Sequence, residues 1–553
     1  MRQDNVSQVI VIGGGAAGLA VAYGLVMRGL TVTVLEFGPV PDPQREFLTD
    51  TPPETLPWRG HGADGEEAYP AAHLISDTDA PYRLGIEAGR SFLKRVRVAG
   101  GKTLYWTAHA LRFGDLEFQA RTLTGRGEDW PLNHATLSPW YAAAERLMGV
   151  TGQPAGLIQH PDGQFQPPLF GLRAAERQMQ AALARQGVPL VLARKAISNG
   201  ERSPACHGCG RCALGCRTAA KYDAFSRLVP AAARTGRLTL RSNAIVTEII
   251  PDANRWAHGV NIMDRQTRAT TSLTAQVVVV AASAVETARL LLASPHPDGG
   301  KGLANSSGLV GVFLSESMGV EIEGWLPALK GTARKSGPRA DSPHHGEHGL
   351  IPRHVNLSPG SEADFGGGWL FLTQSGPTLF PSPAQLQSGF GRAWKQALSA
   401  WHPASIRLQG IAEVGMRREN HIRLDPHQVD TWGRPLPKVS FTLSDEDRAR
   451  WQAMVDAGCT FLDTLGADHI TVRRMVPETG GGLHACGTCR MGKDPVTSVT
   501  NEFGQTHDIP NLFIADASLF VSSLNQPTLT VMALALRQAH FIADWLRHPP
   551  PRR

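Results

Sequence analysis

Two short apolar runs near the start of the chain flank a longer segment with helical spacing. Residues 9–12 form the first run, a helical pattern continues through Arg28, and residues 30–35 form the second run, which ends at Glu36. Apolar runs of this length are typical of buried parallel strands, and the segment between them is long enough for a crossover helix. The pattern therefore predicts a βαβ unit.

The turn after the first run carries Gly13, Gly15 and Gly18 in the spacing Gly-x-Gly-x-x-Gly. The first glycine permits a tight turn, the second lets backbone approach a pyrophosphate, and the third lets helix and strand pack closely. The helix N-terminus then offers unpaired N–H groups to an anion. Glu36 is placed to accept ribose hydroxyls and would repel the 2′-phosphate of NADP. This motif leaves NAD and FAD open.

Helical patterns and strand-like runs continue to alternate along the rest of the chain. A loop followed by a helix is expected over 130–148, and further helices over 172–186, 219–235, 284–293, 444–465 and 528–547. Strands are expected over 238–250 and 276–281, and residues 511–518 are expected to form a buried strand that ends in a polar turn. Asn133 or Ser138 is a candidate N-cap of the first helix, and Ser444 of the fifth. The order is that of a nucleotide-binding fold whose chain returns to complete its sheet.

The pattern of apolar and polar residues changes between residues 319 and 472. Alternating runs separated by glycine- and proline-rich turns occur here, at 406–414, 421–424 and 438–443. Alternation with period two predicts an antiparallel sheet, which suits a substrate-facing domain.

We therefore predict an α/β chain, α+β overall, in which a Rossmann-like dinucleotide-binding domain is interleaved with an antiparallel-sheet domain. The dinucleotide-binding domain is expected to comprise residues 1–50, 90–150, 195–318 and 473–553, and the substrate-binding domain residues 151–194 and 319–472. Residues 51–89 are rich in proline and glycine, so they are expected to form a surface excursion.

Composition and charge narrow the class of protein. The chain has 553 residues, 19% of them charged, and a net charge of +6. Lysine and arginine are scattered, which does not favour a nucleic-acid partner. No apolar run reaches the length of a membrane span, since Glu286 and Arg289 interrupt the nearest candidate at 276–293. The simplest expectation is a cytoplasmic protein, with export or membrane attachment only through a partner.

Six of the seven cysteines are clustered in two places. Cys206, Cys209, Cys212 and Cys216 have the spacing Cys-x2-Cys-x2-Cys-x3-Cys, and Cys486 and Cys489 form a second group. The first spacing matches the bacterial ferredoxin run, although Arg217 stands where proline follows in ferredoxins. An iron–sulfur cluster and structural thiols both remain open for this loop. A disulfide, a reduced pair and plain packing remain open for the second group.

Over nearly its whole length the chain resembles the glucose–methanol–choline (GMC) oxidoreductases, which depend on FAD. The resemblance is carried by the glycine turn with Glu36 and by residues 100–101, 278–287, 420–425, 432–435, 484–488, 515–518 and 527–530. Residues 103–106 and 302–307 are similar to the branch that acts on sugars and glycosides. The resemblance implies oxidation of a hydroxyl group of a sugar, glycoside or aminosugar to a carbonyl.

The resemblance also implies which residues bind the cofactor. The ADP half would be held by Gly13, Gly15, Gly18 and Glu36, the flavin side by Gly100, Gly101 and Thr103, adenine by Val246, and the pyrophosphate and ribityl chain by Asp516 and Ala517, with Pro527 and Thr528 beside them. Tyr105 stands where some relatives attach FAD covalently through histidine, so FAD is expected to be non-covalent. Relatives differ at the four-cysteine loop, because some sugar dehydrogenases hold a cluster near it and other members carry similar loops without a metal.

For catalysis, the resemblance implies that His484 is the base that takes the hydroxyl proton. Imidazole suits this role because its pKa lies near neutrality. Either Asn525 or Gln526 would orient the substrate oxygen, and the sequence leaves that choice open. Electrons would pass to a cytochrome, a quinone or O2 rather than to NAD. Alternatives are an oxidase that uses O2 on an aminoglycoside, sterol or long-chain alcohol, a non-redox lyase, and an electron-transfer subunit.

Overall fold

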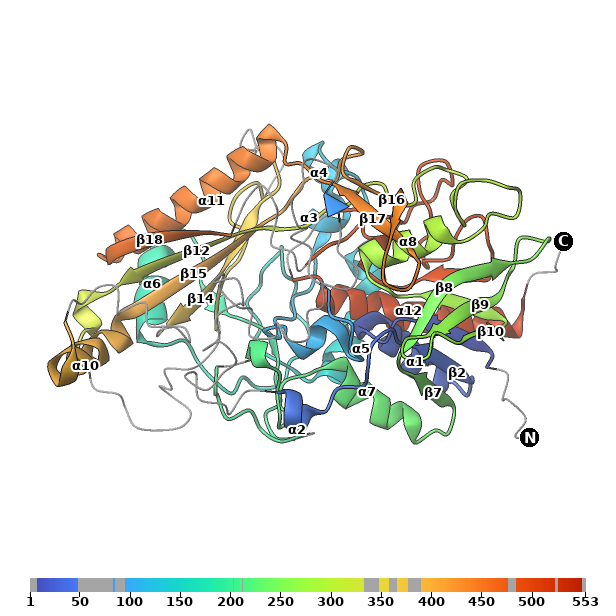
Figure 1. The fold of residues 1–553 in the computed structure, drawn as a ribbon. Helices are drawn as coiled ribbons and strands as arrows, with labels where there is room; N and C mark the ends of the chain where they lie inside the picture. Colours follow the sequence, from blue (N-terminus) through green and yellow to red (C-terminus); the bar gives the residue numbers. More distant parts are fainter. Residues whose placement is uncertain are drawn as a thin grey trace.

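The computed structural model of the chain describes residues 7–47, 83–84, 95–201, 203–210, 212–332, 348–357, 366–375, 389–475, 484–522 and 526–549. Two sheet-based units lie side by side in it (Figure 1). One contains the chain start and the C-terminal helix, and the other contains a large antiparallel sheet covered by a long helix.

The first unit is built on five parallel strands in the order β19-β11-β1-β2-β7. Their bounds in that order are Leu512–Ile514, Val277–Val280, Val9–Ile12, Val32–Leu35 and Leu238–Arg241. Every residue of β19, β11, β1 and β2 is buried, whereas β7, at one edge of the sheet, alternates half-buried and exposed positions. The predicted βαβ unit and its parallel sheet are confirmed.

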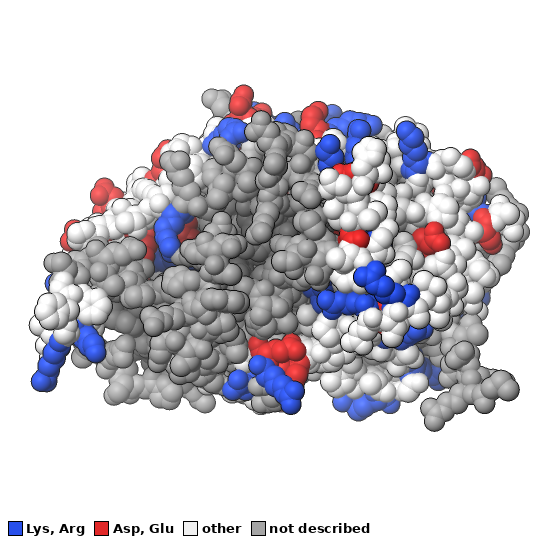
Figure 2. Space-filling view, in the orientation of Figure 1, with Lys and Arg blue, Asp and Glu red and all other residues white. Residues whose placement is uncertain are grey.

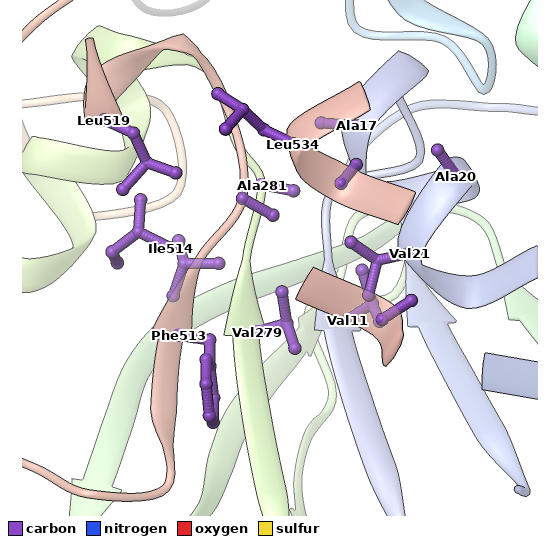
Figure 3. Close-up of a cluster of buried hydrophobic side chains, with 14 of the residues drawn as sticks. Val11, Ala17, Ala20, Val21, Val279, Ala281, Phe513, Ile514, Leu519 and Leu534 are labelled. Carbon is purple, nitrogen blue, oxygen red and sulfur yellow. The ribbon is translucent and has the colours of Figure 1, made fainter. Parts of the chain in front are cut away.

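Two helices from opposite ends of the sequence pack together against this sheet. They are α1 (Ala16–Val26) and α12 (Thr528–Arg547). A Cβ atom on Gly24 would lie 2.6 Å from the Cβ of Ala539, so the two helices cross in close contact. Figure 3 shows apolar side chains from both helices meeting those of three strands, among them Val11, Val21, Val279, Ile514 and Leu534. This apolar packing fixes the strand ends where a ligand can bind.

The predicted strand over 238–250 is two strands in different sheets. After β7 the chain turns at Asn243, which has a φ of 55°. It then enters β8 (Ala244–Pro251), which pairs with β9 (Ala257–Asp264), and β9 pairs with β10 (Thr270–Thr274) in an antiparallel sheet. Asparagine tolerates the left-handed conformation, which explains how the direction changes without glycine.

The second unit is a six-stranded antiparallel sheet in the order β18-β12-β15-β14-β13-β5. The bounds in that order are Asp468–Met475, Met318–Trp325, Ser405–Ala412, Trp369–Ser375, Gly349–Ile351 and Val191–Leu192. Helix α11 (Asp445–Thr464) packs on one face, where a Cβ on Gly410 would meet both Val320 and Met454 within 3 Å. Ser444 is its N-cap, as predicted, and accepts a hydrogen bond from the backbone of Asp447.

The runs at 421–424 and 438–443 do form strands, but in a separate sheet. β16 (His421–Val429) and β17 (Pro435–Ser440) make a hairpin that pairs with β3 (Arg83–Leu84). The hairpin packs on α8 (Ala284–Ala293), where Arg289 lies 2.9 Å from Asp430 and donates to the carbonyl of Pro435. The domain boundaries stay a prediction, and most of the expected excursion at 51–89 lies outside the described residues.

Most of the predicted helices agree with the structure. Those at 284–293 and 528–547 have the expected bounds, and α5 (His134–Met148) is capped by Asn133. Helix α7 (Ala224–Ala233) begins later than expected, because the side chain of Asp223 caps it. The remaining elements include α6 (Ala174–Ala184), α10 (Gly391–Trp401), α2 (Pro43–Glu46), α3 (Asp115–Phe118), α4 (Ala120–Thr124), β4 (Val150–Thr151) and β6 (Lys195–Ala196). Among the described residues, no helix combines the length and apolar character needed to cross a bilayer.

Gly18→Ala is expected to destabilise the first unit by about 3 kcal/mol, because the turn has no room for a side chain. A Cβ there would lie 2.0 Å from the carbonyl oxygen of Gly13, so β1 and α1 would have to move apart. Urea denaturation followed by circular dichroism measures the change. Gly171→Ala is the control, since its Cβ would have no atom within 4 Å. A Gly18→Ala protein as stable as its parent would contradict this account.

Candidate functional site

The carboxyl ends of the parallel strands bring the predicted nucleotide-binding residues to one edge. Gly13 follows β1, Glu36 follows β2, Ala281 follows β11, and Asp516 lies two residues beyond β19. In open parallel sheets ligands bind outside this edge. The sequence places these residues far apart, and the strand order makes them neighbours.

The glycine turn leaves room for a ligand at one position and none at the others. A Cβ on Gly13, which has a φ of 105°, would lie 2.4 Å from the carbonyl oxygen of Ala281, whereas a Cβ on Gly15 would meet no atom within 4 Å. Helix α1 has neither a side-chain cap nor an acid in its first turn. Its first N–H groups therefore have no acceptor from a capping side chain, which suits an anion such as a pyrophosphate.

The second glycine segment lies directly against this turn. The N–H of Gly100 donates to the carbonyl of Gly14 at 2.7 Å, and a Cβ on Gly101 would lie 3.2 Å from the Cα of Gly15. The structure thus brings together two segments that were predicted to serve the two halves of one cofactor. Thr103 donates to the carbonyl of Gly100 and accepts from the N–H of Ala224, so its hydroxyl joins the segment to α7.

Glu36 has a structural role in addition to the predicted one. Its carboxylate accepts the N–H of Gly14 at 2.7 Å and that of Gly38 at 2.9 Å. Burial raises the pKa of Glu36, while these two bonds and the charge of Arg97 oppose the rise. A carboxylate has further lone pairs, so it can still accept ribose hydroxyls. Val246, the predicted adenine neighbour, is buried in β8.

Asp516 uses its whole carboxylate inside the protein. One oxygen accepts the N–H and the hydroxyl of Ser518, and the other accepts the N–H of Ser283 and the hydroxyl of Thr287. The side chain therefore ties β19 to the start of α8. Because both carboxylate oxygens are used in this way, a pyrophosphate or ribityl chain at this segment would contact the backbone of residues 516 and 517.

His484 lies in a loop that is bonded to the segment entering β12 of the antiparallel sheet. Its N–H donates to Oε1 of Glu316 at 2.7 Å, and its Nδ1 lies 2.9 Å from the hydroxyl of Ser317. Ser315 and Cys486 exchange two backbone hydrogen bonds beside them. Burial, together with the charge of Lys102, lowers the pKa of His484 to about 4. The imidazole is therefore neutral at neutral pH, which is the form that accepts a proton.

Of the two residues predicted to orient the substrate oxygen, the structure describes one. Asn525 lies outside the described residues. Gln526 is 9% exposed, has a φ of 62°, and precedes Pro527 and Thr528 at the start of α12. Left-handed backbone in a residue other than glycine is costly and is often found at functional sites.

The sequence reasoning missed further features of the site. Thr488, in the same loop as His484, and Ser283, before α8, have φ values of 76° and 78°. It also missed Lys102 and Glu316, both of which contribute to the electrostatics around His484. Two signals were available in the sequence: a lysine directly after the two glycines, and a glutamate just before an apolar strand. Charged residues are rarely buried without a partner, so each of them pointed to a second charged or polar group nearby.

The four-cysteine loop is closed by a lysine. The ammonium group of Lys221 donates to the carbonyls of Leu104 and Cys212. The backbone N–H of the same lysine lies 3.3 Å from the sulfur of Cys216. Burial raises the pKa of Cys206 to about 11. Within the described ranges no three His, Cys, Asp or Glu side chains are arranged to hold a metal ion. The described residues thus give no evidence for an iron–sulfur cluster at Cys206, Cys209, Cys212 and Cys216. Cys486 and Cys489 are free thiols rather than a disulfide.

The visible surface gives no sign of a polyanionic partner. In Figure 2, lysine and arginine side chains are interspersed with aspartate and glutamate over the described part of this face. A continuous basic stripe, which nucleic-acid binding requires, is not seen there.

Comparisons with known proteins agree with this architecture. Two family models described as GMC oxidoreductase match residues 175–305 and 417–535, and a model of an NAD(P)-binding Rossmann-like domain matches residues 11–41. Across the solved structures, the crystal structure of pyridoxine 4-oxidase from Mesorbium loti aligns with a TM-score of 0.63 over 98% of this chain and 100% of that chain. At 18% identity this likeness concerns the fold.

Curated relatives align over the full length. Paromamine 6'-oxidase of Streptomyces fradiae is 29% identical over 98% of this chain and 92% of its own. The 2-methyl-1,2-propanediol dehydrogenase of Mycolicibacterium austroafricanum is 29% identical, with 97% and 95% covered. The fructose dehydrogenase large subunit of Gluconobacter japonicus is 24% identical, with 98% of each covered. The chain therefore belongs to the GMC oxidoreductases, FAD-dependent enzymes that oxidise hydroxyl groups.

Proposed function

We propose that the chain oxidises a hydroxyl group of a sugar, glycoside or aminosugar to a carbonyl, and that its electrons leave to an acceptor other than NAD. The observation that carries this proposal is His484, a neutral imidazole held beside the nucleotide-binding edge by Glu316 and Ser317. The sugar and aminosugar class is supported by the names of the relatives, which include an oxidase of paromamine and a dehydrogenase of fructose.

The residues present fit a non-covalently bound FAD. The open space at Gly15 and the uncapped start of α1 suit its pyrophosphate, and the buried carboxylate of Glu36 suits its adenosine ribose. A Cβ on Gly101 would have only the Cα of Gly15 within 4 Å, so the backbone of Gly101 lies next to that space without a covering side chain. Tyr105, at the position where other members attach FAD through histidine, has no comparable nucleophilic nitrogen. When bound, the flavin supplies an acceptor for the hydride that leaves the carbinol carbon.

The chain's own residues handle the proton and the orientation of the substrate. His484 accepts the proton of the hydroxyl group, which leaves the electron pair on oxygen to form the carbonyl as hydride departs from carbon. Gln526 or Asn525 donates a hydrogen bond that orients the same oxygen.

A second candidate function is an oxidase that uses O2 on an aminoglycoside. It is favoured by two oxidases among the relatives, paromamine 6'-oxidase and the 6'''-hydroxyparomomycin C oxidase of Streptomyces lividus. Hydrogen peroxide formed in step with substrate oxidation would select this candidate. Turnover that requires an added dye or quinone would select the dehydrogenase.

His484→Ala is expected to slow bleaching of the flavin absorbance by about 10²–10⁴-fold, because the general base is lost. The measurement is anaerobic stopped-flow mixing with a panel of sugars and alcohols. His507→Ala is the matched control, since His507 also bonds a serine hydroxyl, that of Ser498, but lies away from Glu316. Bleaching at the parental rate in His484→Ala would disprove the assignment of the base, and turnover without bleaching would favour a lyase.

The pH dependence of the same rate follows from the lowered pKa of His484. Only the neutral imidazole accepts a proton, so the rate should fall as the pH drops through about 4 and stay level between about 5 and 8. Burial and the charge of Lys102 set this position. A rate that declines already below pH 6.5 would show an ordinary, solvated histidine.

Gly15→Ala is expected to weaken FAD binding by about tenfold or more while leaving the stability of the apoprotein within about 0.5 kcal/mol. The added methyl group meets no protein atom but occupies the space assigned to the pyrophosphate. Isothermal titration of apoprotein with FAD measures the change, and Gly171→Ala is again the control. Unchanged affinity would remove the pyrophosphate from this turn.

The four-cysteine loop is expected to contain no iron, because the ammonium group of Lys221 bonds the carbonyl of Cys212 and no three of the described side chains are arranged to hold a metal ion. Iron and acid-labile sulfide assays on protein purified without oxygen check this expectation, with the visible spectrum recorded on the same sample. Stoichiometric iron and sulfide, lost in Cys212→Ser, would overturn it and restore the cluster that the spacing suggests.

A further inference from the structure

Two buried side chains, those of Glu316 and Ser317, form a series of hydrogen bonds that ends on the ring of the partly buried His484. Oε1 of Glu316 accepts the N–H of Ser317 at 2.9 Å, the hydroxyl of Ser317 at 3.3 Å and the N–H of His484 at 2.7 Å. The hydroxyl oxygen of Ser317 lies 2.9 Å from Nδ1 of His484. Glu316 is fully buried and Ser317 is 4% exposed, so the carboxylate and the hydroxyl that orient the ring are shielded from water.

The direction of each hydrogen bond in this series follows from the carboxylate of Glu316, which stands at one end of it. A carboxylate oxygen that already receives two N–H groups acts as an acceptor, so the hydroxyl of Ser317 donates its hydrogen to Glu316. The same hydroxyl can then only accept from the imidazole. Nδ1 of His484 therefore carries the proton, and Nε2 has the free lone pair.

We propose that Glu316 and Ser317 are positioning residues that hold His484 in the tautomer with Nδ1 protonated, so that Nε2 is the base. This inference rests on the proposed role of His484. In the step itself, the substrate O–H bond breaks and its proton binds Nε2, while the Nδ1 proton stays in its bond to Ser317. No proton leaves Ser317 or Glu316, so the two residues orient the base without taking part in the transfer.

Lys102 extends the arrangement by controlling charge. Its ammonium group interacts with Glu316, with the thiol of Cys486 and with His484. Among the described residues, the charges of Glu316 and Cys486 act on Lys102, and the charge of Lys102 acts on the imidazole. The lysine charge disfavours the imidazolium ion and stabilises the carboxylate, so the base is kept neutral until substrate supplies the proton.

The tautomer can be measured in the FAD-loaded enzyme without turnover. With ¹⁵N-labelled histidine, the ring signals of His484 are assigned by their loss in His484→Gln, and the parent is expected to show Nδ1 protonated. Ser317→Ala should move the proton partly or wholly to Nε2, and Ser317→Thr should restore the parental signals because its hydroxyl is retained. Ser315→Ala is the matched control, since that neighbouring hydroxyl bonds the carbonyl of Val414 instead.

Kinetics provide the second readout on the same proteins. Ser317→Ala should lower the rate constant of flavin bleaching by about 10- to 100-fold, with little change in the substrate concentration that half-saturates it. Ser317→Thr should recover most of the loss. Lys102→Met should move the acid limb of the pH profile to higher pH, because the charge that lowers the pKa of His484 is gone. Ser315→Ala should leave that limb in place.

The outcomes separate the two proposals. An unchanged tautomer and an unchanged rate in Ser317→Ala would overturn the positioning role, even if His484→Ala is inactive. If Ser317→Ala changes the tautomer but His484→Ala bleaches at the parental rate, the positioning is upheld and the base assignment is lost. Should Ser317→Ala lose FAD, the Ser317→Thr rescue and the shift in Lys102→Met decide the matter, and failure of both would overturn the inference.

Discussion

The site depends on direct contact between backbone segments at the carboxyl edge of the parallel sheet. The carbonyl of Gly14 accepts the N–H of Gly100, and Gly13 lies so close to the carbonyl of Ala281 that a side chain would overlap it. Helix α1 can approach β1 closely only because Gly18 has no Cβ. The absence of side chains at these positions brings three strand ends and a helix N-terminus to one surface, where a phosphate group can bind backbone donors.

Buried carboxylates then join the segments that return to this edge. Glu36 accepts the N–H of Gly14, Glu316 accepts that of His484, and Asp516 accepts that of Ser283. Burying a carboxylate is costly unless donors compensate for the lost water, and here backbone N–H groups do so. The same bonds fix the relative positions of segments that are distant in the sequence. The ionisable residues of this region therefore hold the site together as well as giving it reactivity.

Sequence patterns predicted the features that depend on neighbouring residues. The βαβ unit, the helix at 284–293 and the N-cap at Ser444 follow from local spacing and side-chain chemistry. Contacts between distant residues were not accessible in this way. The hairpin of β16 and β17 joins the nucleotide-binding unit through Arg289 and Asp430, and Glu316 reaches His484 across 168 positions. Nothing in the cysteine spacing indicates that Lys221 closes that loop, because the lysine side chain arrives from outside the motif.

The loop of His484 is bonded to both units of the molecule. On one side, Ser315 and Ser317 attach it to the segment that enters β12 of the antiparallel sheet. On the other side, Gly487 donates to the carbonyl of residue 517 beyond β19, and Thr488 donates to the carbonyl of residue 284 at the start of α8. The left-handed backbone of Thr488 is sustained by these bonds, since an isolated loop would relax. The base proposed at His484 would therefore gain its geometry from being fixed to both units at once.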